Sequence, residues 1–106
     1  RNHPVPAAAD FLSYGTTGGA SLLGRPDIGR LAPGMAADLF AIDTRRMDYV
    51  GTRHDPLGLM ARVGIGMAVD LTMINGRIVW RQGEFPGLDE ARLAAEAEAT
   101  LLRLGI

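Results

Sequence analysis

Several residue types are scarce in this chain of 106 residues, and each scarcity excludes a class of protein. There is no cysteine, so disulfide cross-links, thiolate catalysis and thiolate-bound metals are excluded. Eleven basic residues nearly balance twelve acidic ones, every basic residue is arginine, and only 6% of residues are aromatic. Because nucleic-acid surfaces combine a basic excess with stacking aromatics, we expect no nucleic-acid partner.

Long hydrophobic runs are absent as well. No apolar stretch approaches the ~20 residues that span a bilayer, so we expect no membrane partner. The N-terminus has no apolar stretch of signal-peptide length, and the default expectation is a cytoplasmic protein. The chain does not start with methionine, which fits a fragment of a longer protein. With 47% hydrophobic and 22% charged residues, its composition is that of one globular domain or part of one.

Local patterns near the N-terminus predict two short helices. Residues 7–14 are rich in alanine, and Gly15 is expected to end the first helix. Thr16 or Thr17 is expected to cap the second helix, because a threonine hydroxyl can accept from a free backbone N–H. Gly24 is expected to end it.

The middle of the chain is predicted to form turns and short strands. Prolines and glycines between residues 25 and 37 predict turns around a short strand near residues 28–31. Residues 39–42 are predicted to form a buried strand. Asp55 is expected to cap the short apolar segment 57–63.

The firmest local prediction covers residues 70–81. Two apolar strands flank Asn75 and Gly76, which tolerate the positive φ angles of a type I′ turn, so a hairpin is predicted. Residues 88–104 are predicted to form a final helix with Asp89 at its N-terminus.

Residues of the types used in hydrolytic sites do not cluster along the sequence. His3 and His54 are the only histidines, and neither has the close spacing of zinc ligands, so His54 is interpreted as a loop residue. Ser13 and Ser21 have no histidine near enough in sequence to suggest an activated nucleophile.

Carboxylate pairs offer no clearer site. Glu96 and Glu98 are two apart on a predicted helix, so they point in different directions and are expected to be solvated. Asp38 and Asp70 each precede a predicted strand, where aspartate usually accepts backbone hydrogen bonds.

Two weaker patterns are also interpreted structurally. The glycine-rich residues 64–69 are followed by a strand rather than a helix, so they lack the helix N-terminus of a phosphate-binding loop. Trp80 and Phe85 lie near Arg77 and Arg81, but Trp80 is expected to cover the apolar face of the hairpin. The sequence therefore predicts no catalytic, cofactor-binding or metal-binding residue in this chain.

Three segments in order carry a family resemblance. Residues 15–24 (GTTGGASLLG), 28–39 (IGRLAPGMAADL) and 70–80 (DLTMINGRIVW) together resemble the C-terminal signature of the amidohydrolase superfamily. The branch of chlorohydrolases, cytosine deaminases and 8-oxoguanine deaminases is the most similar. Gly15 stands where the family usually has alanine, and Met35 where lysine is common.

The resemblance implies an α+β fold at the end of a (β/α)8 barrel enzyme. Residues 1–27 would be the terminal helices of the barrel. Residues 28–86 would be the C-terminal share of a composite β-sandwich, which the family builds from both ends of the chain. Residues 87–106 would be a closing helix. The family's metal ligands are an H-x-H pair, further histidines and an aspartate from the barrel strands, and none of those motifs occurs here.

In function, the resemblance implies a non-catalytic C-terminal part of a metal-dependent hydrolase. The parent would hold zinc or iron and would hydrolyse a C–N or C–Cl bond on a purine, pyrimidine or triazine. The expected partner is the N-terminal part of the same enzyme, and the isolated chain is expected to self-associate. The alternative is a free-standing small β module that binds a protein partner without catalysis. The substrate, the metal and the oligomeric state stay open.

Overall fold

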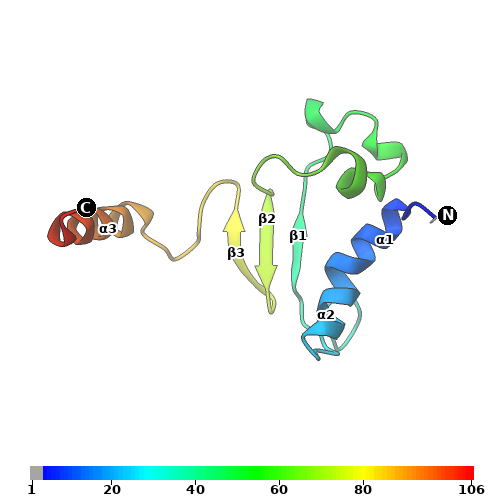
Figure 1. The fold of residues 1–106 in the computed structure, drawn as a ribbon, viewed down its shortest axis with the longest axis horizontal. Helices are drawn as coiled ribbons and strands as arrows, with labels where there is room; N and C mark the ends of the chain where they lie inside the picture. Colours follow the sequence, from blue (N-terminus) through cyan, green and yellow to red (C-terminus); the bar gives the residue numbers. More distant parts are fainter. Residues whose placement is uncertain (1–3) are drawn as a thin grey trace.

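A computed structural model describes residues 4–106 as a small antiparallel sheet with helices at both ends of the chain, an α+β arrangement (Figure 1). The elements in chain order are α1 (Ala8–Ser13), the π-helical turn η1 (Tyr14–Gly18), α2 (Gly19–Leu22), β1 (Leu39–Ala41), the 3-10 turns η2 (Met47–Tyr49) and η3 (Thr52–His54), the π-helical turn η4 (Leu59–Val63), β2 (Leu71–Ile74), β3 (Arg77–Arg81) and α3 (Glu90–Leu104).

The N-terminal helical segment is continuous, which corrects the predicted break at Gly15. α1 passes through η1 into α2 without leaving the right-handed helical region, and Gly15 lies inside the π-helical turn. The Thr16 hydroxyl donates to the Leu12 carbonyl at 2.7 Å, and the Thr17 hydroxyl donates one turn back as well. Both threonines therefore bond back along the helix instead of capping a new one. Gly24 follows the helix end at φ +65°, as predicted.

Residues 28–31 form bends and an extended loop, so the predicted strand there is wrong. The physical reason lies at Gly29, where the chain turns at φ +92° to contact the helix. A Cβ on Gly29 would lie 2.9 Å from the Ala20 Cβ and 3.0 Å from the Thr16 carbonyl oxygen. The segment therefore packs closely against α2 and does not pair as a strand.

The hairpin is confirmed. β2 and β3 pair antiparallel, and the two turn residues Asn75 and Gly76 have φ of 49° and 77°, as a type I′ turn requires. β1 pairs antiparallel with the other side of β2, with Leu39 opposite Met73, so the sheet order is β1-β2-β3. The predicted strand at residues 39–42 is present, but it is not buried: Leu39 is half-buried and Phe40 is 49% exposed.

The segment of the chain that joins β1 to β2 contains the buried residues Tyr49, Thr52 and Leu59. The Thr52 hydroxyl donates to the Tyr49 carbonyl at 2.7 Å. η4 packs against α1 from this segment. Its N-cap is Gly58 and not the predicted Asp55, because the helical turn begins two residues later than expected.

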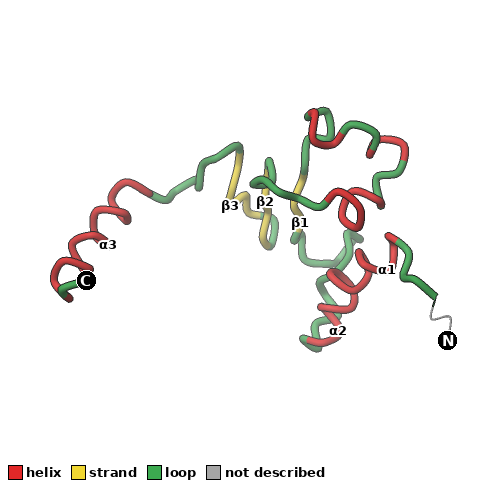
Figure 2. The backbone as a smooth tube through the Cα atoms, turned by 45° about the horizontal axis from the view of Figure 1, so that its top comes forward, coloured by secondary structure: helices red, strands yellow, loops and turns green. Residues whose placement is uncertain are grey.

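α3 begins as the sequence predicts. The Asp89 carboxylate accepts the Arg92 backbone N–H at 3.0 Å and caps the helix. Every residue of α3 is exposed, and the helix stands apart from the sheet in both views (Figures 1 and 2). Within residues 4–106, no helix combines the length and apolar character needed to cross a membrane.

The chain is much less compact than a typical domain of its length. Its radius of gyration is 18.4 Å, whereas a compact domain of this length has about 13 Å. Its accessible surface is 8554 Å², against about 5,700 Å² for a folded monomer of this mass. Among the described residues, the buried apolar set consists only of Ala20, Tyr49 and Leu59. Much apolar surface is therefore uncovered.

Candidate functional site

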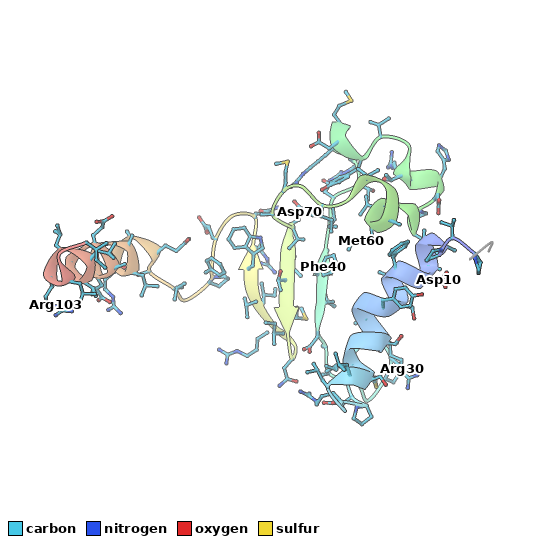
Figure 3. The ribbon with its side chains drawn as sticks, in the orientation of Figure 1. Asp10, Arg30, Phe40, Met60, Asp70 and Arg103 are labelled. Atoms are coloured by element: carbon cyan, nitrogen blue, oxygen red, sulfur yellow. The ribbon has the colours of Figure 1, made fainter. Side chains whose placement is uncertain are left out.

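A largely apolar groove lies between the N-terminal helix and β1. It has a volume of about 530 Å³, and its apolar lining includes Leu12, Leu23, Leu31 and Phe40. Figure 3 shows Phe40 on β1, beside the helix that forms the other wall. Leu23 and Leu31 are 71% and 68% exposed, so the groove is open. A groove of this kind can accept apolar side chains from another segment, but it offers no chemistry of its own.

Asp70 lies directly before β2 and makes hydrogen bonds to three separate segments (Figure 3). Its carboxylate accepts the Asp43 backbone N–H at 2.6 Å and the Arg46 guanidinium at its other oxygen. Its backbone N–H donates to the Ala41 carbonyl and its own carbonyl accepts from Gln82 N–H, both at 2.9 Å. Asp70 therefore ties the segments after β1 and β3 to the start of β2.

Asp38 performs the matching role at the other end of β1. Its carboxylate accepts the Asn75 backbone N–H at 2.7 Å, and the Gly76 N–H donates to the Ala37 carbonyl at 3.0 Å. The prediction that Asp38 and Asp70 accept backbone hydrogen bonds is confirmed. The Arg46 contact was not predicted, because 24 residues separate it from Asp70 and no local pattern signals it.

Two exposed ion pairs lower the pKa of the carboxylate that takes part in each pair. Arg45 contacts Asp43 through Nε at 2.9 Å and through a terminal nitrogen at 2.8 Å. These hydrogen bonds, together with the Arg45 backbone N–H, hold the pKa of Asp43 well below its usual range. The side-chain hydrogen bond from Arg25 lowers the pKa of Asp27 in the same way. Both carboxylates are thereby held ionised as turn-stabilising acceptors, which makes them poor proton donors.

The histidine and serine candidates do not converge on a site. His54 is exposed at the end of η3, and His3 lies outside the described residues. Ser13 lies 3.3 Å from the Thr17 hydroxyl on its own helix, and Ser21 is exposed on α2. Across residues 4–106, no group of three or more His, Cys, Asp or Glu side chains could hold a metal ion. Residues 4–106 therefore offer no set of ligands for the divalent ion that the resemblance implies.

The remaining candidates occupy structural positions. The Trp80 indole N–H donates to the Val69 carbonyl at 2.6 Å, and its ring meets Phe85 edge-on at 4.8 Å between centroids. Glu96 pairs with Arg92 at 3.4 Å on the exposed surface of α3, and Glu98 is exposed on the same helix. None of these contacts is that of a general acid or base.

Comparison with known proteins shows the family. Residues 1–79 match the amidohydrolase family. The chain is 56% identical over 104 residues to hydroxydechloroatrazine ethylaminohydrolase from Pseudomonas sp. (strain ADP). The aligned region covers 98% of this chain and 22% of that protein. The chain is 41% identical over 90 residues to 8-oxoguanine deaminase from Pseudomonas aeruginosa, covering 83% of this chain and 19% of that protein.

A solved structure shows the same arrangement. Atrazine chlorohydrolase from Arthrobacter aurescens TC1, complexed with zinc, matches with a TM-score of 0.76 and 32% identity. The match covers 88% of this chain and 20% of that chain. The present chain thus spans about a fifth of the length of the relatives that it matches.

Proposed function

The chain belongs to the amidohydrolase family, and we propose that it is the C-terminal, non-catalytic part of a metal-dependent hydrolase. The observation that carries this proposal is the 56% identity to hydroxydechloroatrazine ethylaminohydrolase over nearly the whole chain. That identity spans only 22% of the relative, so the chemistry would lie in the other four-fifths of the protein.

The substrate class follows from the names of the relatives. They include an ethylaminohydrolase, an 8-oxoguanine deaminase and an atrazine chlorohydrolase. We infer hydrolysis at a ring carbon of a nitrogen heterocycle, with an amine, ammonia or chloride as the leaving group. The higher identity to the ethylaminohydrolase favours a C–N bond over a C–Cl bond. A cytoplasmic location is part of the proposal.

The metal would be held elsewhere in the protein. A matching chlorohydrolase structure contains zinc, whereas the described residues of this chain offer no ligand set. Zinc or iron would therefore be bound by the remainder of the polypeptide, and no step of the reaction is assigned to residues of this chain.

The partner of this chain would be the remainder of the same polypeptide. Residues 1–27 would close the barrel, residues 28–86 would complete the β-sandwich, and residues 87–106 would form the closing helix. The open groove beside β1 and the excess of accessible surface support this role, because large exposed apolar surfaces are typical of sites that another segment covers.

The proposal is tested with the full-length enzyme that contains this chain. Assays with an N-alkylamino-triazine, 8-oxoguanine and a chloro-triazine should show release of amine or ammonia in preference to chloride. Removal of metal by a chelator should abolish turnover, and zinc or iron should restore it. Turnover that survives complete metal removal would contradict the proposal, as would inactivity towards every amino-substituted heterocycle.

The 106-residue chain by itself provides the matched control. We expect it to bind no stoichiometric zinc after chelator treatment and to hydrolyse none of these substrates. Stoichiometric zinc that is lost on His54→Ala would show that this segment contributes a metal ligand.

A further inference from the structure

The turn between β2 and β3 places a side-chain amide next to a reactive backbone nitrogen. Asn75 is followed by Gly76, which has no Cβ to hinder an attack by its own nitrogen. In that attack the Gly76 nitrogen bonds to the Asn75 Cγ and the Cγ–Nδ2 bond breaks. The departing amide group takes the Gly76 proton and leaves as ammonia. Water then opens the cyclic imide at either carbonyl, which gives an aspartyl or an isoaspartyl residue.

Two hydrogen bonds from the start of β1 hold the backbone of this pair. The Asn75 N–H donates to the Asp38 carboxylate at 2.7 Å, and the Gly76 N–H donates to the Ala37 carbonyl at 3.0 Å. Figure 1 shows the turn at the same end of the sheet as the start of β1. The second bond holds the proton that the attacking nitrogen must lose. These two contacts, named here the turn clasp, lie within the chain and do not depend on what covers it.

The backbone conformation of the turn also opposes the attack. Asn75 and Gly76 have φ of 49° and 77°, the left-handed pair of a type I′ turn. In such a turn the side chain of the first residue lies away from the nitrogen of the second. The ring can therefore close only after the clasp opens and Asn75 leaves the left-handed region. We propose that Asn75 is a site of spontaneous deamidation and that the turn clasp keeps it unmodified in the folded chain.

Deamidation at this position would be an irreversible change of structure. The new carboxylate at residue 75 would lie near the Asp38 carboxylate, and two like charges at this distance repel. An isoaspartyl product would also lengthen the main chain inside a two-residue turn, whose length fixes the pairing of β2 with β3. The clasp thus protects the register of the sheet. This proposal does not rest on the hydrolase chemistry.

The chain contains its own reference for the reaction. Gln82 and Gly83 form a second turn with φ of 48° and 92°, and the Gln82 N–H donates to the Asp70 carbonyl at 2.9 Å. The glutamine side chain is one methylene longer, so its attack closes a larger ring and is slower. Trypsin cleaves after arginine and separates the two sites. Peptide 63–77 contains Asn75 as its only side-chain amide, and peptide 82–92 contains only Gln82.

Variants of the full-length protein that contains this chain test the clasp. Asp38→Ala should accelerate the loss of the Asn75 amide at neutral pH by about two- to tenfold, because it removes one hydrogen bond. Asp38→Asn keeps an acceptor oxygen and should react at the native rate. Asp70→Ala is the matched control, since it removes a carboxylate that accepts a backbone N–H beyond the other end of β1. Mass spectrometry of peptide 63–77 measures the rates, and Gln82 should stay intact throughout.

Hydrogen exchange supplies a test that needs no variant. Exchange of the Gly76 N–H and attack by its nitrogen both require the clasp to open. Both should therefore be slower in the native protein than in urea, by the same factor of at least about tenfold. Equal rates in the native and the urea-unfolded protein would overturn the proposal. So would a native rate in Asp38→Ala, or an equal acceleration by Asp70→Ala.

Discussion

Single carboxylates in this chain hold turns together, and Asp43 shows the effect most clearly. Its hydrogen bonds from the Arg45 side chain and backbone lower its pKa, so folding favours the ionised form. The stabilisation is present above the unfolded pKa of about 4 and is lost as the pH falls through the folded pKa. Acid should therefore weaken the turn after β1.

The Asp43 carboxyl pKa can be measured directly by NMR titration. We expect a value below the usual range in the native chain, and a return towards about 4 in Arg45→Ala. Arg25→Ala is the control, because its partner is Asp27 and the Asp43 value should not respond. An Asp43 pKa that is ordinary in the native chain would mean that this exposed pair does not persist in solution.

At the scale of the element, the hairpin depends on the turn between β2 and β3. Gly76 has φ +77°, which a β-branched side chain resists. Gly76→Val should lower the free energy of unfolding by about 1 to 3 kcal/mol. Thermal unfolding followed by circular dichroism measures the loss. Asn75→Gly should change stability little, since glycine accepts the φ of 49° at that position; a Gly76→Val chain that melts normally would refute the turn type.

The contact between α2 and the loop at Gly29 makes a second prediction for an element. Gly29 and Gly34 have similar φ angles of 92° and 82°, but only Gly29 approaches the helix, since a Cβ on Gly34 would meet no atom within 4 Å. Gly29→Ala should therefore destabilise the chain more than Gly34→Ala, by about 1 to 3 kcal/mol. Equal losses of melting temperature would mean that backbone strain alone, and not the close approach to Ala20, determines the cost.

At the scale of the whole molecule, the main feature is the large amount of accessible surface. The accessible surface exceeds that of a compact monomer of this mass by about half, and the groove beside β1 is open. β1 also has one edge that pairs with no other strand among the described residues, and such edges recruit partners.

We therefore expect the isolated chain to associate through the groove and the free edge of β1. Light scattering should show species larger than a monomer. Phe40→Ser, on the groove, should reduce them, whereas Val5→Ser, away from the groove lining, should not. A compact monomer at high concentration, with amide exchange protection along both strand edges, would contradict this expectation.

The sequence by itself determined the elements whose signals are local. Asn75–Gly76 specified the hairpin and Asp89 specified the start of α3, because turn and capping preferences depend on residues within one turn of the chain. The order of three short segments was also sufficient to identify the family.

Tertiary structure alone decided the rest. Gly15 continues the helix instead of ending it. Gly29 bends against Ala20, and this close approach between separate segments has no local signal in the sequence. Arg46 reaches Asp70 across 24 residues, which no local pattern can signal. Phe40 is apolar in a strand and yet exposed, since burial depends on which surface lies opposite, and the surface opposite β1 is an open groove.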